Sequence, residues 1–534
     1  MTALESACAT VAELFTRSYA EHPDRPAVED ARGSFTYAEL RDRARLIAGR
    51  LRAEGLQPGD RVLLLVDNRS EFHQVEHAVT LGHWVRVAVN TRMHPAEVTH
   101  VVEDAAPAYA FIESDWLARA GAEWLAQMPC PVVDVGRTDP GAAPCAAELP
   151  SFTDFLGGPS DDLDFPPPTP DEPVWFMYTS GSTGMPKGVV HTHRTMTSMA
   201  NRIRRALPGL DHTDVAVHTA PLSHMSGAVA IAVTAAGGSN VCLPHFDPGT
   251  LFDVVAEKSA TVVPLVPTQL NMVTGYLREH PRDLSSVRLV PYAGSAIAPD
   301  RLEAAKTYFG DALIQMYGAS EAPMPLASLP PQDHVGHVNR LGLPRFASAG
   351  RPVDGVEVQI RDLDNTVLPA GERGEIVVRT PSVTPGYWNK PEATAEILEA
   401  DGFCHTGDVG VIDEDGYLFL LDRKKDMIIT GGFNVYPREV ENALSGMPGV
   451  AEVAVVSAPS EQWGESIVAV IAPEPGADLT LEQVQDHCRA SLAGYKVPRR
   501  LELVDALPKG GTGKVLKREL ARQYWGDAER RVGG

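Results

Sequence analysis

Cysteine is scarce in this sequence and is never paired at short spacing. The 534 residues include six cysteines, Cys8, Cys130, Cys145, Cys242, Cys404 and Cys488. No two of them form the Cys-x-x-Cys pair that zinc sites use, and they lack the density of a disulfide framework. The sequence therefore indicates neither a zinc site nor a disulfide-stapled fold, and we expect a reducing, cytoplasmic location.

Long apolar runs are also absent. No uninterrupted apolar stretch approaches the roughly 18 residues that a membrane-spanning helix needs. The first residues, MTALESACATVAELF, have neither a basic start nor an apolar centre, so they do not resemble a secretory signal. We expect a soluble protein that does not insert into membranes.

Positive charge is in deficit. The chain carries 47 Lys and Arg residues against 70 Asp and Glu residues, a formal net charge of -23 at pH 7. Such a chain repels polyanions, so neither nucleic acid nor an anionic membrane is expected as its main partner. Composition leaves the oligomeric state open, a homodimer included.

Helix and strand signals alternate along the chain. Thr36 and Glu39 have capping-box spacing, Gly55 can end the helix that follows, and residues 61–66 predict a buried strand. The apolar pattern predicts the same order again, with a strand at 85–89, a helix at 95–103 and a strand at 109–112. This order predicts an α/β fold with a doubly wound sheet.

The C-terminal part has a different character. Beyond residue 422 come short strands at 450–456 and 467–471, a capped helix from Thr480 and a Gly-rich loop at 510–513. These elements predict two domains, a large αβ body over 1–422 with several subdomains and a small α+β domain over 423–534. With 44% hydrophobic residues, the chain can bury a core in each.

Residues 178–188, YTSGSTGMPKG, carry the main chemical signal. They follow the apolar run 174–177 with three glycines, four Ser and Thr side chains and one lysine, Lys187. A loop at the end of a strand that offers backbone N–H groups, hydroxyls and a mobile cation suits a polyphosphate. A Walker A loop is excluded, because Lys187 lies between Pro186 and Gly188.

Eight motifs in series resemble the adenylate-forming superfamily of acyl- and aryl-CoA ligases, nonribosomal adenylation domains and luciferases. They are YTSGSTGMPKG (178–188), PLSHMSG (221–227), YGASE (317–321), GERGEIVVR (371–379), GYWNKPEAT (386–394), HTGD (405–408), DRKKDMIITGGFNVYPREVE (422–441) and PKGGTGK (508–514). The resemblance covers nearly the whole chain. It implies a two-domain enzyme whose large body includes a small β-rich subdomain and whose C-terminal domain is mobile. Such an enzyme makes an acyl-AMP from a carboxylic acid and ATP, releases pyrophosphate and then passes the acyl group to CoA.

The resemblance implies a nucleotide site built from several segments. It assigns the β- and γ-phosphates to Thr179, Ser180, Gly181, Ser182, Thr183, Gly184 and Lys187. It assigns adenine and its surroundings to Gly294, Ser295, Ala296, Tyr317, Gly318, Ala319 and Ser320, and the ribose to Asp408 with Arg423. Glu321 is expected to bind Mg²⁺ that bridges phosphate oxygens.

Catalysis is expected from Lys514, His224, Thr183 and Glu321. Lys514 lies in a Gly-rich loop and would reach the carboxylate and the α-phosphate, and Lys425 matches the hinge of the family. Rotation about Lys425 would then replace the Lys514 loop by the face that carries Gly431 and Gly432, along which the thiol arm of CoA approaches.

The acid is expected to lie against mostly small side chains. The resemblance places His224, Ser226, Ala230, Ala293, Pro323 and Met324 around it, which leaves space for an aryl or medium-chain acid. Coumarate:CoA ligase-like proteins have glycine where Pro323 falls, and this departure speaks against a standard cinnamate-type acid.

Other acceptors and roles stay open at this point. A carrier protein carries the same pantetheine thiol as CoA, and unusual relatives use an amine acceptor or activate a small oxyanion such as nitrite. Arg438, Lys496, Arg499 and Arg500 are candidate contacts for CoA phosphates. A nucleotide-binding module without turnover is a further alternative, and the presence of Glu321, Asp408 and Lys514 argues against it.

Overall fold

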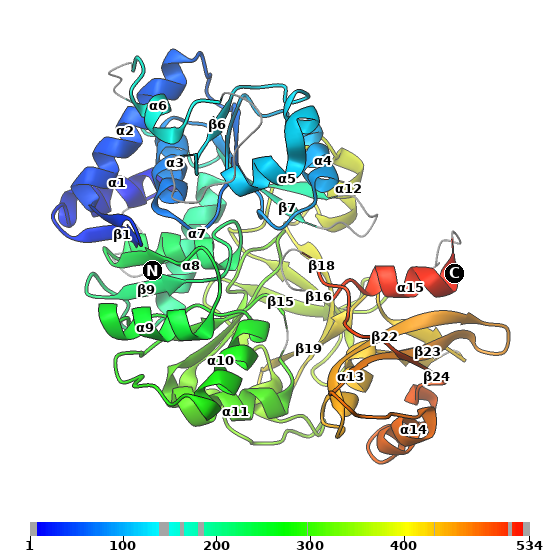
Figure 1. The fold of residues 1–534 in the computed structure, drawn as a ribbon. Helices are drawn as coiled ribbons and strands as arrows, with labels where there is room; N and C mark the ends of the chain where they lie inside the picture. Colours follow the sequence, from blue (N-terminus) through cyan, green and yellow to red (C-terminus); the bar gives the residue numbers. More distant parts are fainter. Residues whose placement is uncertain are drawn as a thin grey trace.

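The computed structural model describes residues 8–137, 149–160, 165–179, 186–295, 297–431, 433–510 and 515–526. Elements from the first 420 residues form a large body, and the orange and red C-terminal elements gather on one side of it (Figure 1). Among the described helices, none combines the length and the apolar character that crossing a bilayer requires.

A seven-stranded sheet organises the N-terminal half of the body. Its strands run in the order β17-β8-β7-β4-β3-β5-β6, and the five from β7 to β6 are parallel. Their bounds are β3 Arg61–Leu65, β4 Val85–Ala88, β5 Tyr109–Ile112, β6 Val132–Asp134, β7 Pro173–Thr179, β8 Lys187–Thr192 and β17 Gly386–Tyr387. The three strands expected from the apolar pattern are confirmed as β3, β4 and β5.

Both faces of this sheet are covered, because successive side chains of a strand point to opposite sides. Val62 and Leu64 join a core that includes helices α2 and α3, whereas Leu63 and Leu65 join a core that includes α4 and α5. The helices are α2 Tyr37–Ala53, α3 Ser70–Leu81, α4 Pro95–Ala105 and α5 Ser114–Leu125. The doubly wound arrangement is therefore confirmed, together with the capping box of Thr36 and Glu39 that begins α2.

Two further sheets complete the α/β part of the body. One has the order β2-β1-β10-β9, the other β11-β12-β13-β14. Their bounds are β1 Pro26–Asp30, β2 Gly33–Thr36, β9 Val215–His218, β10 Ser239–Cys242, β11 Val290–Tyr292, β12 Leu313–Tyr317, β13 Ala327–Leu329 and β14 Arg351–Pro352. The helices of this region are α1 Val11–Glu21, α7 His193–Ala206, α8 Met225–Ala235, α9 Pro248–Lys258, α10 Pro267–Glu279 and α11 Pro299–Phe309. Two short helices lie elsewhere in the body, α6 Phe152–Leu156 and α12 Pro391–Ile397.

The last part of the body is a four-stranded antiparallel sheet, which corresponds to the expected β-rich subdomain. Its order is β15-β16-β18-β19, with bounds β15 Glu357–Arg361, β16 Gly374–Arg379, β18 Cys404–Ile412 and β19 Leu418–Arg423. The hairpin of β18 and β19 pairs Asp408 with Arg423, so these two residues lie opposite each other on the ladder.

The C-terminal elements form a sheet of their own. Strands β20 Ile428–Thr430, β21 Phe433–Val435, β22 Val450–Ser460, β23 Gly464–Pro473 and β24 Arg500–Leu503 pair only with one another among the described residues. Helices α13 Pro437–Ser445, α14 Leu481–Arg489 and α15 Lys517–Trp525 complete this unit. The domain boundary at 422/423 stays a prediction, and the unit meets the body at Asp422, whose carboxylate accepts the Arg438 N–H at 2.9 Å.

Two helical glycines offer a test of packing in the body. A Cβ atom at Gly227 in α8 would lie 1.9 Å from the Leu222 carbonyl oxygen, whereas one at Gly275 in α10 would meet nothing within 4 Å. We expect Gly227→Ala to lower the free energy of unfolding by about 3 kcal/mol, because backbone must shift. Gly275→Ala, the control, should raise it by about 0.5 kcal/mol. Urea unfolding followed by tryptophan fluorescence measures both, and equal midpoints would contradict the geometry.

Candidate active site

The predicted phosphate loop joins two antiparallel strands. It connects the end of β7 to the start of β8, where Thr179 pairs with Lys187. The next helix, α7, begins only at His193, after β8. Phosphate binding here would therefore use a hairpin and its lysine rather than the N-terminus of a helix. Several predicted residues lie outside the described ones, namely Ser180, Gly181, Ser182, Thr183, Gly184, Ala296, Gly432 and Lys514, and their roles stay predictions.

Lys187 and Glu321 come together around a tyrosine that the sequence reasoning did not single out. The Lys187 ammonium lies 5.2 Å from the centre of the Tyr387 ring, and the Tyr387 hydroxyl donates to Glu321 Oε1 at 2.6 Å. The signal was present, because Tyr387 belongs to the motif GYWNKPEAT. The predicted phosphate cation and the predicted metal ligand thus share one neighbour.

Glu321 lies in a tight turn after β12. A Cβ atom at Gly318 would lie 2.4 Å from the Met324 backbone nitrogen, so only glycine fits where the chain folds back on itself. The turn is tied down by two hydrogen bonds, from the Thr384 N–H to the Glu321 carbonyl oxygen at 2.8 Å and between His191 Nε2 and the Ser320 carbonyl oxygen at 3.0 Å. The Glu321 carboxylate is thereby held on a rigid loop.

The chemistry of Glu321 fits Mg²⁺. Among the described side chains, no basic group forms an ion pair with it, and its Oε2 atom accepts no hydrogen bond. Mg²⁺ prefers one or two carboxylates together with substrate phosphates and water. Glu321 would hold the ion, which would draw charge from the phosphate oxygens.

The predicted ribose and adenine residues also lie together. Asp408 is only 7% exposed, and its two oxygens receive the Tyr317 hydroxyl and the Arg423 Nε, each at 2.7 Å. Burial and the neighbouring carboxylate raise the pKa of Tyr317 well above its usual value, so its hydroxyl remains a donor. Each Asp408 oxygen keeps lone pairs that ribose hydroxyls can use. Three segments of the chain thus meet at one carboxylate.

The strand next to β12 in its sheet, β11, ends in an exposed loop. Gly294 and Ser295 are exposed directly after it, and Gly294 has a φ of +96°, which only glycine adopts readily. Ala293, the predicted pocket residue, is 3% exposed. Ala319 and Gly318 are half-buried in the turn before Glu321.

The predicted acid-binding residues differ in how far they are exposed. His224 precedes α8 and is partly exposed, with Nδ1 2.8 Å from the Ser223 hydroxyl. Ser226, in contrast, is fully buried, and its hydroxyl lies 2.8 Å from His218 Nδ1. The Ser226 hydroxyl is thus engaged inside the body. Ala230 is 1% exposed on the same helix.

A buried arginine holds the turn that carries Pro323 and Met324. Arg202 of α7 donates from Nη2 to the Pro323 carbonyl oxygen and from Nε to the Pro325 carbonyl oxygen, both at 3.1 Å. Its remaining N–H groups bind the hydroxyls of Ser198, Thr380 and Ser382. Burial lowers the pKa of Arg202 to about 10. The sequence reasoning missed this residue, because nothing in its helical context marks it.

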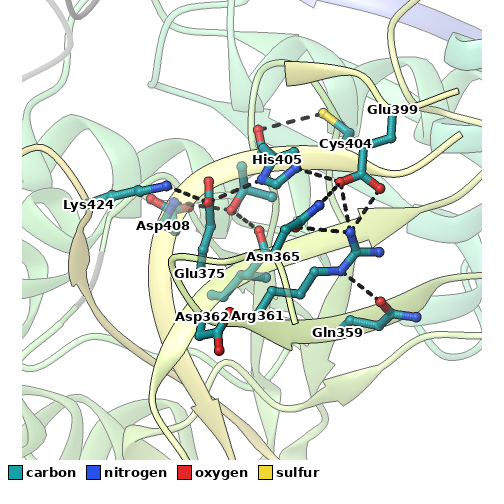
Figure 2. A network of polar contacts seen from close by, with 12 residues as sticks. Gln359, Arg361, Asp362, Asn365, Glu375, Glu399, Cys404, His405, Asp408 and Lys424 are labelled. Atoms are coloured by element: carbon teal, nitrogen blue, oxygen red, sulfur yellow. Dashed lines mark hydrogen bonds and ion pairs between the residues drawn. The ribbon is translucent and has the colours of Figure 1, made fainter. Parts of the chain in front are cut away.

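A polar network lies beneath the predicted hinge (Figure 2). Lys424, between Arg423 and Lys425, reaches Glu375 Oε2 at 2.8 Å. His405 lies between two carboxylates, with Nδ1 3.2 Å from Glu375 and Nε2 2.9 Å from Glu399. Glu375 and Glu399 raise the pKa of His405. The network anchors the residue directly before Lys425 to the antiparallel sheet.

Two family models match this chain. The one described as AMP-binding enzyme matches residues 15–388, and the one described as AMP-binding enzyme C-terminal domain matches residues 439–514. The chain belongs to the AMP-binding enzyme family. The resemblance predicted from the eight motifs is confirmed.

The relatives of this AMP-binding enzyme differ in what their names specify. A feruloyl-CoA synthase from Amycolatopsis sp is 36% identical over 516 residues, 94% of this chain and 96% of that protein. The fatty acid–[acyl-carrier-protein] ligase ScoC from Streptomyces coeruleorubidus is 34% identical over 528 residues, 97% of each protein. The structure of the amide bond synthetase McbA from Marinactinospora thermotolerans is 32% identical, has a TM-score of 0.82 and aligns over 96% of this chain and 99% of that one. The predicted fold class and the predicted ligase class are confirmed.

The Asp408 carboxylate can be tested directly. Asp408→Asn keeps the shape of the side chain but removes the charge that holds Arg423, so we expect the affinity for ATP to fall about tenfold. Titration with a fluorescent ATP analogue measures it. Asp401→Asn, an exposed aspartate of the same region, is the control. An unchanged affinity in Asp408→Asn would rule out its assignment to the nucleotide.

The raised pKa of His405 predicts a pH-dependent contribution to stability. Glu375 and Glu399 stabilise the His405 imidazolium in the folded state. Its contribution to the free energy of unfolding is therefore fully present below the unfolded pKa of about 6.5. This contribution is lost as the pH rises through the raised pKa of His405 in the folded state. His405→Gln should therefore be destabilising at pH 6 and much less so at pH 9, as measured by urea unfolding. The exposed His337→Gln is the control, and a larger effect at pH 9 would contradict the sign.

Proposed function

We propose that this enzyme activates an aryl or medium-chain carboxylic acid with ATP and Mg²⁺ as an acyl-AMP and then transfers the acyl group to CoA. The observation that carries the proposal is that the Tyr317 hydroxyl and the Arg423 guanidinium both bind the buried carboxylate of Asp408. Lys187 and Glu321 supply a phosphate cation and a metal ligand. Two anions must approach each other in the first step, and these groups offset the charge that builds up.

The second step needs a place for the thiol donor. Phe433, 55% exposed beside the Gly431 turn, stacks on Tyr495 with ring centres 4.7 Å apart. Arg499 lies 4.6 Å from the centre of the Trp463 ring, which is 38% exposed. Flat aromatic faces beside a guanidinium suit an adenine nucleotide with its phosphates. This surface supports CoA as the acceptor.

The predicted basic contacts for CoA differ in availability. Arg499 lies on this aromatic surface. Lys496 is buried and its ammonium is 2.5 Å from Glu439 Oε1, so its charge is already paired. The Arg438 guanidinium lies close to Asp422 and Glu441, and burial lowers its pKa. Arg499 is therefore the basic residue that we assign to CoA among these three.

A carrier protein or an amine is the second candidate acceptor. ScoC and McbA support it, because relatives of similar identity are named for those acceptors. The acid itself is assigned only by class, since Ala230, Ala293 and Met324 belong to one apolar cluster and none of the three side chains can bind a second polar group on the acid. We also propose a cytoplasmic location and no nucleic-acid partner, as the composition predicts.

Pyrophosphate exchange separates the ligase from a binding module. With labelled pyrophosphate, label should enter ATP when one acid of a panel of aryl and medium-chain acids is present, because pyrophosphate attacks the bound acyl-AMP, re-forms ATP and releases the acid. CoA, a holo carrier protein or an amine supplied afterwards identifies the acceptor by the product. If none of the acids supports exchange, the proposed activity is contradicted. A small oxyanion such as nitrite belongs in the panel as well.

Lys514 is proposed to act only in the first step. Lys514→Ala should lower pyrophosphate exchange by about 100-fold or more, because the cation that meets the carboxylate and the α-phosphate is lost. ATP binding and thiol transfer from preformed acyl-AMP should remain. Lys509→Ala is the matched control, since Lys509 is five residues away and pairs with Glu452 at 2.5 Å. Near wild-type exchange by Lys514→Ala would reject the assignment.

A further inference from the structure

Tyr387 lies between Lys187 and Glu321, the predicted phosphate contact and the predicted metal ligand. It belongs to β17, which pairs with β8 so that Tyr387 lies opposite Val189, two residues from Lys187. Its backbone N–H donates to the Thr394 hydroxyl of α12 at 2.9 Å. The position of the ring is therefore determined by the phosphate hairpin on one side and by α12 on the other.

The ring and the hydroxyl of Tyr387 contact different partners. The ring lies near the Lys187 ammonium, which a π-face attracts. The hydroxyl donates to Glu321 Oε1 at 2.6 Å, a hydrogen bond to a charged acceptor. The other Glu321 oxygen, Oε2, accepts no hydrogen bond from any described residue.

We propose that Tyr387 is a positioning residue that holds Glu321 in register with Lys187, so that a divalent cation on Glu321 and a triphosphate on Lys187 meet correctly. The inference rests on the proposed function. Arg202 holds the backbone beyond Glu321, through the Pro323 and Pro325 carbonyl oxygens, whereas Tyr387 holds the carboxylate itself. One Glu321 oxygen is fixed by the phenol and the other is left for the cation.

A tyrosine of the C-terminal unit provides a matched control. Tyr524 of α15 is half-buried, and its hydroxyl donates to Glu502 Oε2, so it too binds a carboxylate. Glu502 lies in β24 of the C-terminal sheet, whereas Lys187 and Tyr387 lie in the seven-stranded sheet. Loss of the Tyr524 hydroxyl costs a hydrogen bond of the same kind without touching the predicted metal ligand.

The test measures how much Mg²⁺ improves ATP binding at equilibrium. Calorimetric titration of ATP into wild-type enzyme, Tyr387→Phe and Tyr524→Phe is done in Mg²⁺ and in EDTA. The gain is the ratio of the ATP affinity in Mg²⁺ to the ATP affinity in EDTA. We expect this ratio to be about tenfold smaller in Tyr387→Phe than in the wild type, while the affinity in EDTA is the same in both. Tyr524→Phe should keep the full gain. A purely structural role would weaken binding equally with and without Mg²⁺.

The outcomes are separable. An unchanged Mg²⁺-dependent gain in folded Tyr387→Phe overturns the inference, whereas absence of ATP binding by the wild-type enzyme overturns the proposed function. In the Glu321→Gln background, Tyr387→Phe should have no further effect on the gain, and an additive loss would also overturn the inference. Tyr387→Leu, which lacks the same hydroxyl, replaces Tyr387→Phe in the titration if the phenylalanine variant does not fold.

Discussion

The pairing of β8 with β7 on one side and with β17 on the other is the constraint on which the site depends. Backbone hydrogen bonds across β8 place Lys187 next to β7 and Tyr387 next to Val189. Two motifs about 200 residues apart in the chain thereby share one strand. Because a ladder leaves little freedom in register, the cation and the phenol are positioned before any substrate binds.

Polar groups around the site are buried at a cost that their partners offset. Among the residues that the structure describes, Arg202 has no carboxylate as a hydrogen-bond partner, and its donors are matched by two carbonyl oxygens and three hydroxyls. Leaving such donors unpaired would cost more than the bonds return. The turn that carries Glu321 is therefore held by a group that cannot easily move, which suits a metal ligand.

The antiparallel sheet joins the nucleotide site to the C-terminal unit. The Asp408 and Arg423 pair lies on the β18–β19 ladder, and the next residue, Lys424, is anchored through Glu375. Glu399 keeps its charge because Asn365 and Arg361 lower its pKa to about 2. Residues up to Lys424 are thus tied to the body, so rotation in the second step would begin at Lys425, as the family resemblance implies.

The sequence alone determined the α/β alternation and the family, because capping boxes, apolar periods and motif order are local properties. Strands β3, β4 and β5 and the capped helix α2 followed from such local patterns. Only the tertiary structure decided which side chains meet. Arg202 gave no local signal, and the motif that contains Tyr387 did not indicate its role, because their partners, the Pro323 and Pro325 carbonyl groups and Glu321, lie far away in the chain. Ser226 lies in a predicted pocket motif, yet its hydroxyl bonds to His218 in the core, since burial is decided by packing between elements.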